Sequence, residues 1–282
     1  MSDERTLELE AEIARLNTQI EKLQSQVILN PAGITSKHGP GTIALPCNDL
    51  SRYSSFTLAL ATMNLPLGTQ IAMVRSMDVT ANLNAILREM VRPQDEWVWF
   101  IGDDHTFEED VLLRLLDHEV DVVVPLVAKK NPPFRLVLFS KEEFMEHDDG
   151  REYPHYSYMD MEELPQNGLT EVYACGSAGM LVRREVIDAV GNPWFENPHG
   201  TVVNDDLEFC RKIREKGYTI HADTDTMMGH IGMVNVYPGK RDGMWGIYLD
   251  FGSQSGGENR IFMATSPIQI KEGEGGEVLN AS

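Results

Sequence analysis

An apolar run that ends at two carboxylates and an imidazole constrains this chain more than any other feature. Residues Trp97–Ile101 are all apolar and include two tryptophans and a phenylalanine, and Gly102, Asp103, Asp104 and His105 follow directly. Such a run predicts a strand buried on both faces, as in the parallel sheet of an α/β protein. Adjacent acids at the end of that strand are costly unless a cation binds them.

The carboxyl ends of parallel strands are where open α/β sheets bind their ligands. We therefore expect a divalent metal held by hard oxygen ligands, with a phosphate-bearing substrate completing its coordination shell. An alternative interpretation is an acidic turn that opens the next helix, because Glu108, Glu109 and Asp110 come next.

Composition narrows the class of protein. The chain has 282 residues, a hydrophobic content of 42% and a formal net charge of -20, which argues against a sequence-blind grip on nucleic acid. No apolar run is long enough for a membrane span or a signal segment, so we expect a cytoplasmic protein without membrane contact. The cysteines Cys47, Cys175 and Cys210 are far apart, which favours buried thiols over disulfides or a zinc site.

The first thirty residues form a separate predicted unit. Apolar residues alternate at spacings of four and three, at Leu9, Ile13, Leu16, Ile20, Leu23 and Val27. This heptad pattern predicts an amphipathic coiled-coil helix over 1–30 and a homo-oligomer that forms through it, although packing on the body is the alternative. A linker is expected over 31–41, one α/β domain over 42–270 and a disordered tail over 271–282.

Within the body, strand and helix patterns alternate. Strands are expected over 42–46, 70–74, 96–101, 120–127 and 218–221, and helices over 50–63, 79–90, 107–116, 184–190 and 205–216. This alternation predicts a doubly wound, mostly parallel sheet flanked by helices. Residues 137–139 suggest an edge strand, 140–168 a polar excursion over the surface, and 232–260 a mobile loop.

Four separated segments resemble, in their order and spacing, the GT-A glycosyltransferases, particularly the family-2-like group of nucleotide-sugar enzymes. They are Gly102–His105, Cys175–Gly179, Asn204–Cys210 and Gly229–Gly232. The resemblance covers about residues 42 to 232 and implies the GT-A fold, which is Rossmann-like.

The resemblance also implies a metal site. Asp104 falls on the final acid of the family's Asp-x-Asp element, which binds the metal, and Asp103 falls on its middle position beside the donor. Gly102 replaces the first acid, so the contact of that acid passes to Asp103 or His105, or is lost. His230 corresponds to the family's late histidine, and the expected ion is Mn²⁺ or Mg²⁺ with His105 as a further candidate ligand.

By the same resemblance, Asp205 and Asp206 form the catalytic acid pair, with Asp206 as the general base of an inverting reaction. Plain capping of the helix by Asn204 or Asp205 is the competing interpretation. Gly176 and Ser177 allow the backbone to approach the donor sugar closely.

The nucleotide is expected to contact Pro46 and Asn48 after the first strand and Arg75 after the second. Together these residues predict transfer of a sugar from a nucleotide diphosphate, a UDP-sugar by preference, to an acceptor hydroxyl. The acceptor stays open among a glycan, a protein, a small molecule and a modified DNA base, and a retaining reaction is also open. Two rival functions are a nucleotidyltransferase or sugar-nucleotide pyrophosphorylase, and a non-catalytic coiled-coil scaffold with a degenerate sugar-nucleotide domain.

Overall fold

The computed structural model describes residues 34–35, 37–47, 53–75, 78–146, 150, 152–197, 204–251 and 260–264. The predicted coiled-coil helix over 1–30 and the predicted tail over 271–282 lie outside these residues. The chain divides into two compact units. Among the described residues, the first unit holds those up to Lys129 and Phe134–Ile231, and the second holds Lys130–Pro133 and those from Gly232 onward.

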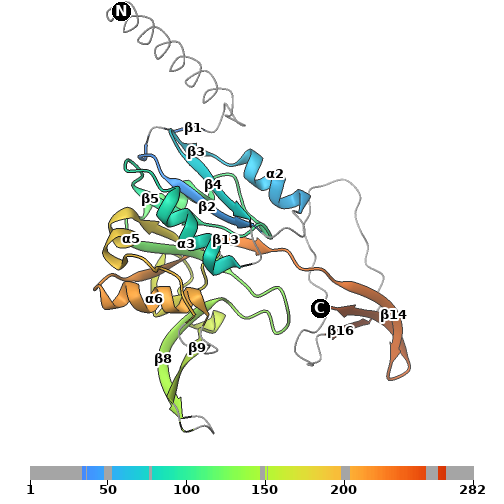
Figure 1. Ribbon diagram of the computed structural model, residues 1–282. Coiled ribbons are helices and arrows are strands. Elements are labelled where there is room, and N and C mark those ends of the chain that lie inside the picture. Colours follow the sequence, from blue (N-terminus) through green and yellow to red (C-terminus); the bar gives the residue numbers. More distant parts are fainter. Residues whose placement is uncertain are drawn as a thin grey trace, which may run out of the picture. The chain divides into compact units, whose positions relative to one another are not determined.

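A central sheet of mostly parallel strands forms the first unit (Figure 1). Its strands follow the order β10–β13–β7–β12–β5–β2–β4, and β6 pairs with β13 outside that path. Five strands share one direction, and β12 and β10 run against it. The bounds are β2 Thr42–Cys47, β4 Gln70–Arg75, β5 Trp97–Phe100, β6 His105–Thr106, β7 Val122–Val127, β10 Leu169–Val172, β12 Leu181–Arg183 and β13 Ile220–His230. The predicted α/β class with a largely parallel sheet is confirmed.

Helices cover both faces of this sheet, which explains the unbroken apolar run of β5. Val98 and Phe100 point into one core with α3, α5 and α6, whereas Trp97 and Trp99 point into a second core with α2 and α4. Successive side chains of a strand face opposite sides, so a strand between two helical layers is apolar throughout. The helices are α2 Ser54–Thr62, α3 Val79–Glu89, α4 Val111–Asp117, α5 Arg184–Val190 and α6 Asp205–Glu215.

A buried acid anchors the start of β5. Asp95 is 2% exposed, accepts a hydrogen bond from Thr42 Oγ1 at 2.6 Å, and pairs with Arg92 Nη2 at 2.6 Å. Burial alone raises the pKa of this carboxyl, but its hydrogen bonds to Arg92 and Thr42 and the guanidinium charge outweigh burial and lower it. Through the hydrogen bond to Thr42, Asp95 therefore links the start of β5 to the start of β2.

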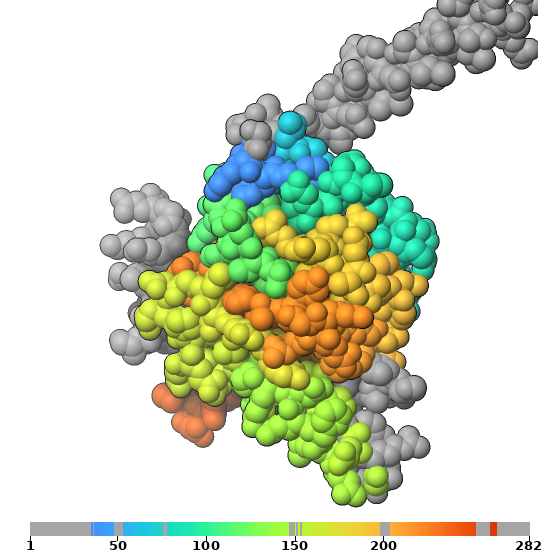
Figure 2. Space-filling view, turned by 90° about the vertical axis from the view of Figure 1, so that its left-hand side faces the viewer, coloured from blue at the N-terminus to red at the C-terminus, as the bar shows by residue number. Residues whose placement is uncertain are grey.

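The segment after β7 differs from the expectation of an irregular surface excursion over 140–168. It forms an antiparallel sheet of β8 Leu138–Glu146, β9 Glu152–Tyr158 and β11 Ala174–Cys175, followed after β9 by the short helix η1 Met161–Glu163. The sequence did not predict these strands, because most side chains of β8 from Ser140 onward are polar and exposed. Such a strand lacks the alternation of apolar and polar residues that marks a half-buried strand. In Figure 2, the hairpin of β8 and β9 lies below α6 (orange).

The second unit differs from the predicted mobile loop over 232–260. It holds an antiparallel sheet of β14 Asn235–Arg241, β15 Met244–Asp250 and β16 Arg260–Ala264. Gly239 and Gly246 suggested a loop, but a Cβ at either position would strike an aromatic ring, of Tyr248 and Phe262 respectively. The rings cover the glycines and fill the space that their missing side chains leave.

A short parallel pair, β1 Ile34–Thr35 with β3 Leu65–Pro66, completes the described strands. No helix among the described residues is both long enough and apolar enough to span a membrane.

Candidate active site

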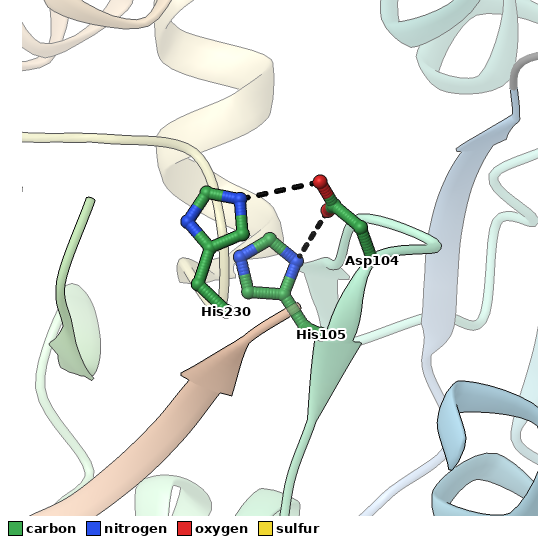
Figure 3. A group of neighbouring side chains, drawn as sticks. All are labelled: Asp104, His105 and His230. Atoms are coloured by element: carbon green, nitrogen blue, oxygen red, sulfur yellow. Dashed lines mark hydrogen bonds and ion pairs between the residues drawn. The ribbon is translucent and has the colours of Figure 1, made fainter. Parts of the chain in front are cut away.

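Three side chains converge at the carboxyl end of β5 (Figure 3). Asp104 and His105 follow β5 through a turn, and His230 is the last residue of β13. Asp104 Oδ2 lies 3.2 Å from His230 Nε2, and Asp104 Oδ1 lies 3.0 Å from His105 Nδ1. One candidate ligand atom from each of the three residues lies within 4.8 Å of the other two. We call these three residues the Asp-His-His group.

Backbone pairing brings these residues together although His230 lies 126 positions after Asp104. The short strand β6 pairs with the end of β13, so that His105 lies opposite His230 and Thr106 opposite Gly229. The backbone N–H of Ile231 also donates to the carbonyl of Asp104 at 2.7 Å. The group therefore rests on paired backbone rather than on loose loops.

Hydrogen bonding fixes the orientation of His230. Its Nδ1 lies 3.1 Å from the carbonyl oxygen of Ala128, which only accepts, so Nδ1 carries the proton. The other nitrogen, Nε2, is then the lone-pair donor and faces Asp104. Histidines that bind metals are commonly oriented in this way by a backbone carbonyl.

His105 supplies the observation that tests whether a metal fits. His105 is 3% exposed, its Nδ1 faces the carboxylate of Asp104 at 3.0 Å without forming a hydrogen bond, and its Nε2 has no hydrogen-bond partner among the described residues. Buried polar atoms nearly always find a partner, so an imidazole left this way beside a carboxylate calls for one. Its ring also stacks on that of His230, with centroids 4.4 Å apart. A divalent ion bound to one carboxylate and two imidazoles would satisfy one of the buried nitrogens of His105.

Position 102 has no space for a side chain beside Asp104 and His105. A Cβ at position 102 would lie 2.9 Å from His105 Nδ1 and 3.0 Å from Asp104 Oδ1. A side chain there would therefore displace the other two residues. The glycine leaves room for the imidazole of His105 beside Asp104, which supports His105 rather than residue 102 as part of the group.

Asp205 and Asp206 both accept backbone N–H groups at the start of α6, whereas Asn204 does not. The side chain of Asn204 makes no capping hydrogen bond. Asp205 Oδ1 accepts from the backbone N–H of Asp206 at 3.0 Å, and its Oδ2 accepts from Thr80 Oγ1 at 2.7 Å. Asp206 Oδ1 accepts from the backbone N–H of Leu207 at 2.9 Å. The helix terminus stabilises both negative charges.

Asp206 is the acid whose protonation is most perturbed. Burial and the adjacent charge of Asp205 raise its pKa from 3.8 to about 6, although backbone N–H groups of Leu207 and Ser177 partly oppose the shift. A carboxylate with a pKa near 6 is ionised at neutral pH and more basic than an ordinary aspartate. Those are the properties of a general base.

The glycine-rich turn joins the acid pair to β5. A Cβ on Gly176 would lie 2.7 Å from Val137 Cγ1 and 3.4 Å from Asp206 Oδ2, and Gly179 donates its N–H to the carbonyl of Phe100 at 2.8 Å. Gly179 has a φ of +80° and no space for a side chain, because a Cβ would lie 2.6 Å from Pro125 Cγ. Both glycines are therefore required for the turn to fit between β5, β7 and α6.

The residues predicted to hold the nucleotide are placed less fully. Pro46 and Arg75 lie at the carboxyl ends of the neighbouring parallel strands β2 and β4, in register with Val74 and Cys47 respectively. Asn48 lies outside the described residues. Asp103 lies, half-buried, in the turn before Asp104. Their roles in donor binding remain predictions.

Two positioning groups escaped the sequence reasoning. Thr80 of α3 holds Asp205, and the backbone carbonyl of Ala128 orients His230. A backbone carbonyl has no side-chain signal, and a threonine in the first turn of a helix is too common to single out.

No protein-family model matches the sequence, and no curated protein matches it significantly. Solved structures similar to the chain include A197 from STIV, with 14% identity, a TM-score of 0.46, and coverage of 68% of this chain and 85% of that one. GalNAc-T7, crystallised with UDP, GalNAc and Mn²⁺, has 9% identity and a TM-score of 0.46, and the match covers 68% of this chain and 43% of that one. Residues 1–349 of S. aureus TarS have 13% identity and a TM-score of 0.42, and the match covers 69% of this chain and 60% of that one.

This chain therefore spans less than two thirds of the GalNAc-T7 and TarS chains. The similarity concerns the fold alone, so the chemistry has to be inferred from this chain's own residues.

Proposed function

We propose that this protein is a metal-dependent glycosyltransferase that moves a sugar from a nucleotide diphosphate to an acceptor hydroxyl. The convergence of Asp104, His105 and His230 at the carboxyl end of β5 carries the proposal. That edge of an α/β sheet is where such folds bind their ligands.

The Asp-His-His group would hold Mn²⁺ or Mg²⁺, and a bound ion would stabilise the negative charge that develops on a diphosphate leaving group. Asp104 offers a carboxylate oxygen, and His230 offers Nε2, already directed by the Ala128 carbonyl. His105 offers a ring nitrogen that otherwise stays buried without a hydrogen bond among the described residues.

Asp206 would act as the general base that removes the proton from the acceptor hydroxyl. Its raised pKa of about 6 keeps it ionised at neutral pH and strengthens it as a base. Asp205, fixed by Thr80, supplies the neighbouring charge that contributes to the shift. A base that activates the acceptor hydroxyl for direct attack would give inversion at the sugar carbon.

The donor would be a UDP-sugar, with its nucleotide over the ends of β2 and β4, where Pro46 and Arg75 lie. Gly176 and Ser177 would let the backbone approach the sugar beside Asp206. The acceptor class is open among glycan, protein, small molecule and modified DNA base.

A nucleotide titration tests the proposal. We expect UDP to raise the melting temperature in the presence of Mn²⁺ and to have little effect without it, since a ligand that binds the native state stabilises it by mass action. Asp104→Asn should abolish this effect. The matched control is Asp188→Asn, because Asp188 is an exposed acid that pairs with Arg184 on α5.

Two results would contradict the proposal. One is stabilisation by UDP that does not depend on Mn²⁺ or on Asp104. The other is the release of pyrophosphate rather than UDP when the protein is incubated with Mn²⁺ and a UDP-sugar, which would favour the nucleotidyltransferase or pyrophosphorylase alternative.

A further inference from the structure

Two cations lie on the ring of Tyr158, in the segment that follows Ala128, and neither has a counter-ion among the described residues. Lys129 Nζ lies 4.7 Å from the ring centroid of Tyr158 and is hydrogen-bonded to its hydroxyl, and Arg135 Cζ lies 5.3 Å from the same centroid. Neither cation makes an ion pair with any residue that the structure describes.

Backbone contacts hold these two cations at the edge of the sheet that carries the site. The N–H of Lys129 donates to the carbonyl of Arg135 at 2.9 Å, so the two residues face each other where the chain leaves and rejoins the first unit. Ala128, the residue before Lys129, binds His230. Val137, two residues after Arg135, accepts the N–H of Gly176 at 3.1 Å.

The backbone before Lys129 is thus hydrogen-bonded to His230 of the Asp-His-His group, and the backbone after Arg135 is hydrogen-bonded to the turn beside Asp206. Two positive charges on one tyrosine ring repel each other, and the ring offsets only part of that cost. An anion bound between them would remove the repulsion and form charge-assisted hydrogen bonds. The protein's net charge of -20 also means that an anionic ligand needs a local positive site to approach.

We propose that Lys129 and Arg135, positioned on Tyr158, form a binding site for a phosphate group of a substrate. The phosphate belongs either to the donor diphosphate or to an acceptor that itself carries a phosphate. This inference deepens the proposed function, because it adds a second anion-binding element to the metal group.

Calorimetric titration with inorganic phosphate, in the absence of metal and nucleotide, tests this site directly. We expect the double variant Lys129→Gln/Arg135→Gln to bind phosphate at least tenfold more weakly than the wild type. The control Lys216→Gln/Lys240→Gln removes the same charge. Neither control residue makes an ion pair with a described residue, and Lys240 also lies on an aromatic ring, that of Trp245. This control should stay within twofold of the wild type.

A second titration, with UDP and Mn²⁺, identifies the source of the phosphate. An equal loss of UDP affinity in the Lys129/Arg135 variant assigns the site to the donor diphosphate. Unchanged UDP affinity, with weakened phosphate binding, assigns it to a phosphorylated acceptor. The inference is overturned if the wild type does not bind phosphate, or if the control weakens binding as much as the site variant does.

Failure of the proposed function gives a different result from failure of this site. Asp104→Asn should lose the response to UDP and Mn²⁺ and keep phosphate binding unchanged. Circular dichroism of each variant checks that the fold is intact. We expect it to be intact in the Lys129/Arg135 variant, because both residues are exposed.

Discussion

Asp206→Asn should change how the stability of this protein depends on pH. In the folded chain, burial and the charge of Asp205 raise the pKa of Asp206 from 3.8 to about 6. A carboxyl whose pKa is raised on folding stabilises the native state fully below pH 3.8, and that stability is lost as pH rises through 6. The neutral amide has no such dependence.

The size of the effect follows from the shift. Each unit of pKa corresponds to about 1.4 kcal/mol, so the complete loss is about 3 kcal/mol. In the unfolded chain, the carboxyl of Asp206 is already mostly ionised at pH 5. Only about 1.4 kcal/mol of that loss therefore falls between pH 5 and pH 8. The free energy of unfolding of the wild type should therefore fall relative to Asp206→Asn by about 1.4 kcal/mol over this interval.

Urea denaturation of both proteins at pH 5, 6, 7 and 8 measures this difference. Taking the difference between the two proteins cancels the other titrating groups, apart from the neighbouring Asp205. A difference that does not change with pH would refute the reasoning, and so would a wild type that gains on the variant as pH rises. Either result would mean that folding does not raise the pKa of Asp206, and its carboxylate would then be a weaker base than the one proposed here.

Three further predictions concern the surroundings of the site. Gly102→Ala should weaken Mn²⁺ binding by about 10- to 100-fold in calorimetry, because its Cβ would lie 2.9 Å from His105 Nδ1. Thr80→Val should lower the free energy of unfolding by about 1 kcal/mol in urea, because it removes the 2.7 Å hydrogen bond to Asp205. Asp95→Ala should lower that free energy by about 2–4 kcal/mol at pH 7 and by less at low pH. The reason is that the pKa of Asp95 is lowered on folding, so its contribution is present above pH 3.8 and is lost as pH falls through the folded pKa.

Matched variants keep these predictions specific. Thr57→Val removes an exposed 3.3 Å hydrogen bond to the Tyr53 carbonyl and should cost less than Thr80→Val. Gly102→Ala should keep its calorimetric phosphate binding, since Lys129 and Arg135 are untouched. Equal losses in the two threonine variants, or unchanged Mn²⁺ affinity in Gly102→Ala, would contradict the corresponding contacts.

The central sheet was predictable because its strands are short, apolar and buried between two helical layers. The run Trp97–Ile101 could only be a strand with helices on both sides, and β5 has that environment. The two smaller sheets gave no such signal. Strand β8 is largely exposed, and Gly239 and Gly246 of the second unit imitate a loop because aromatic rings replace their missing side chains.

The convergence of the site was only partly contained in the sequence. The position of the acids directly after an apolar strand identified them as site candidates. The sequence around His105 gives no sign that it contacts His230, which lies 125 positions later. That pairing depends on β6 and β13 and on the carbonyl of Ala128, which are properties of the folded backbone. The resemblance to the GT-A class supplied the expectation, and the register of the strands supplies the physical reason.

Titration of the protein with Mn²⁺ in the presence of UDP, followed by electron paramagnetic resonance of the free ion, measures whether the Asp-His-His group is a metal site. We predict one bound ion per chain in the wild type, loss of that ion in His230→Ala, and retention in His221→Ala, which removes a histidine from the same strand. A wild type that binds no ion, or a His230→Ala variant that binds it as well as the wild type, would contradict the metal-dependent mechanism.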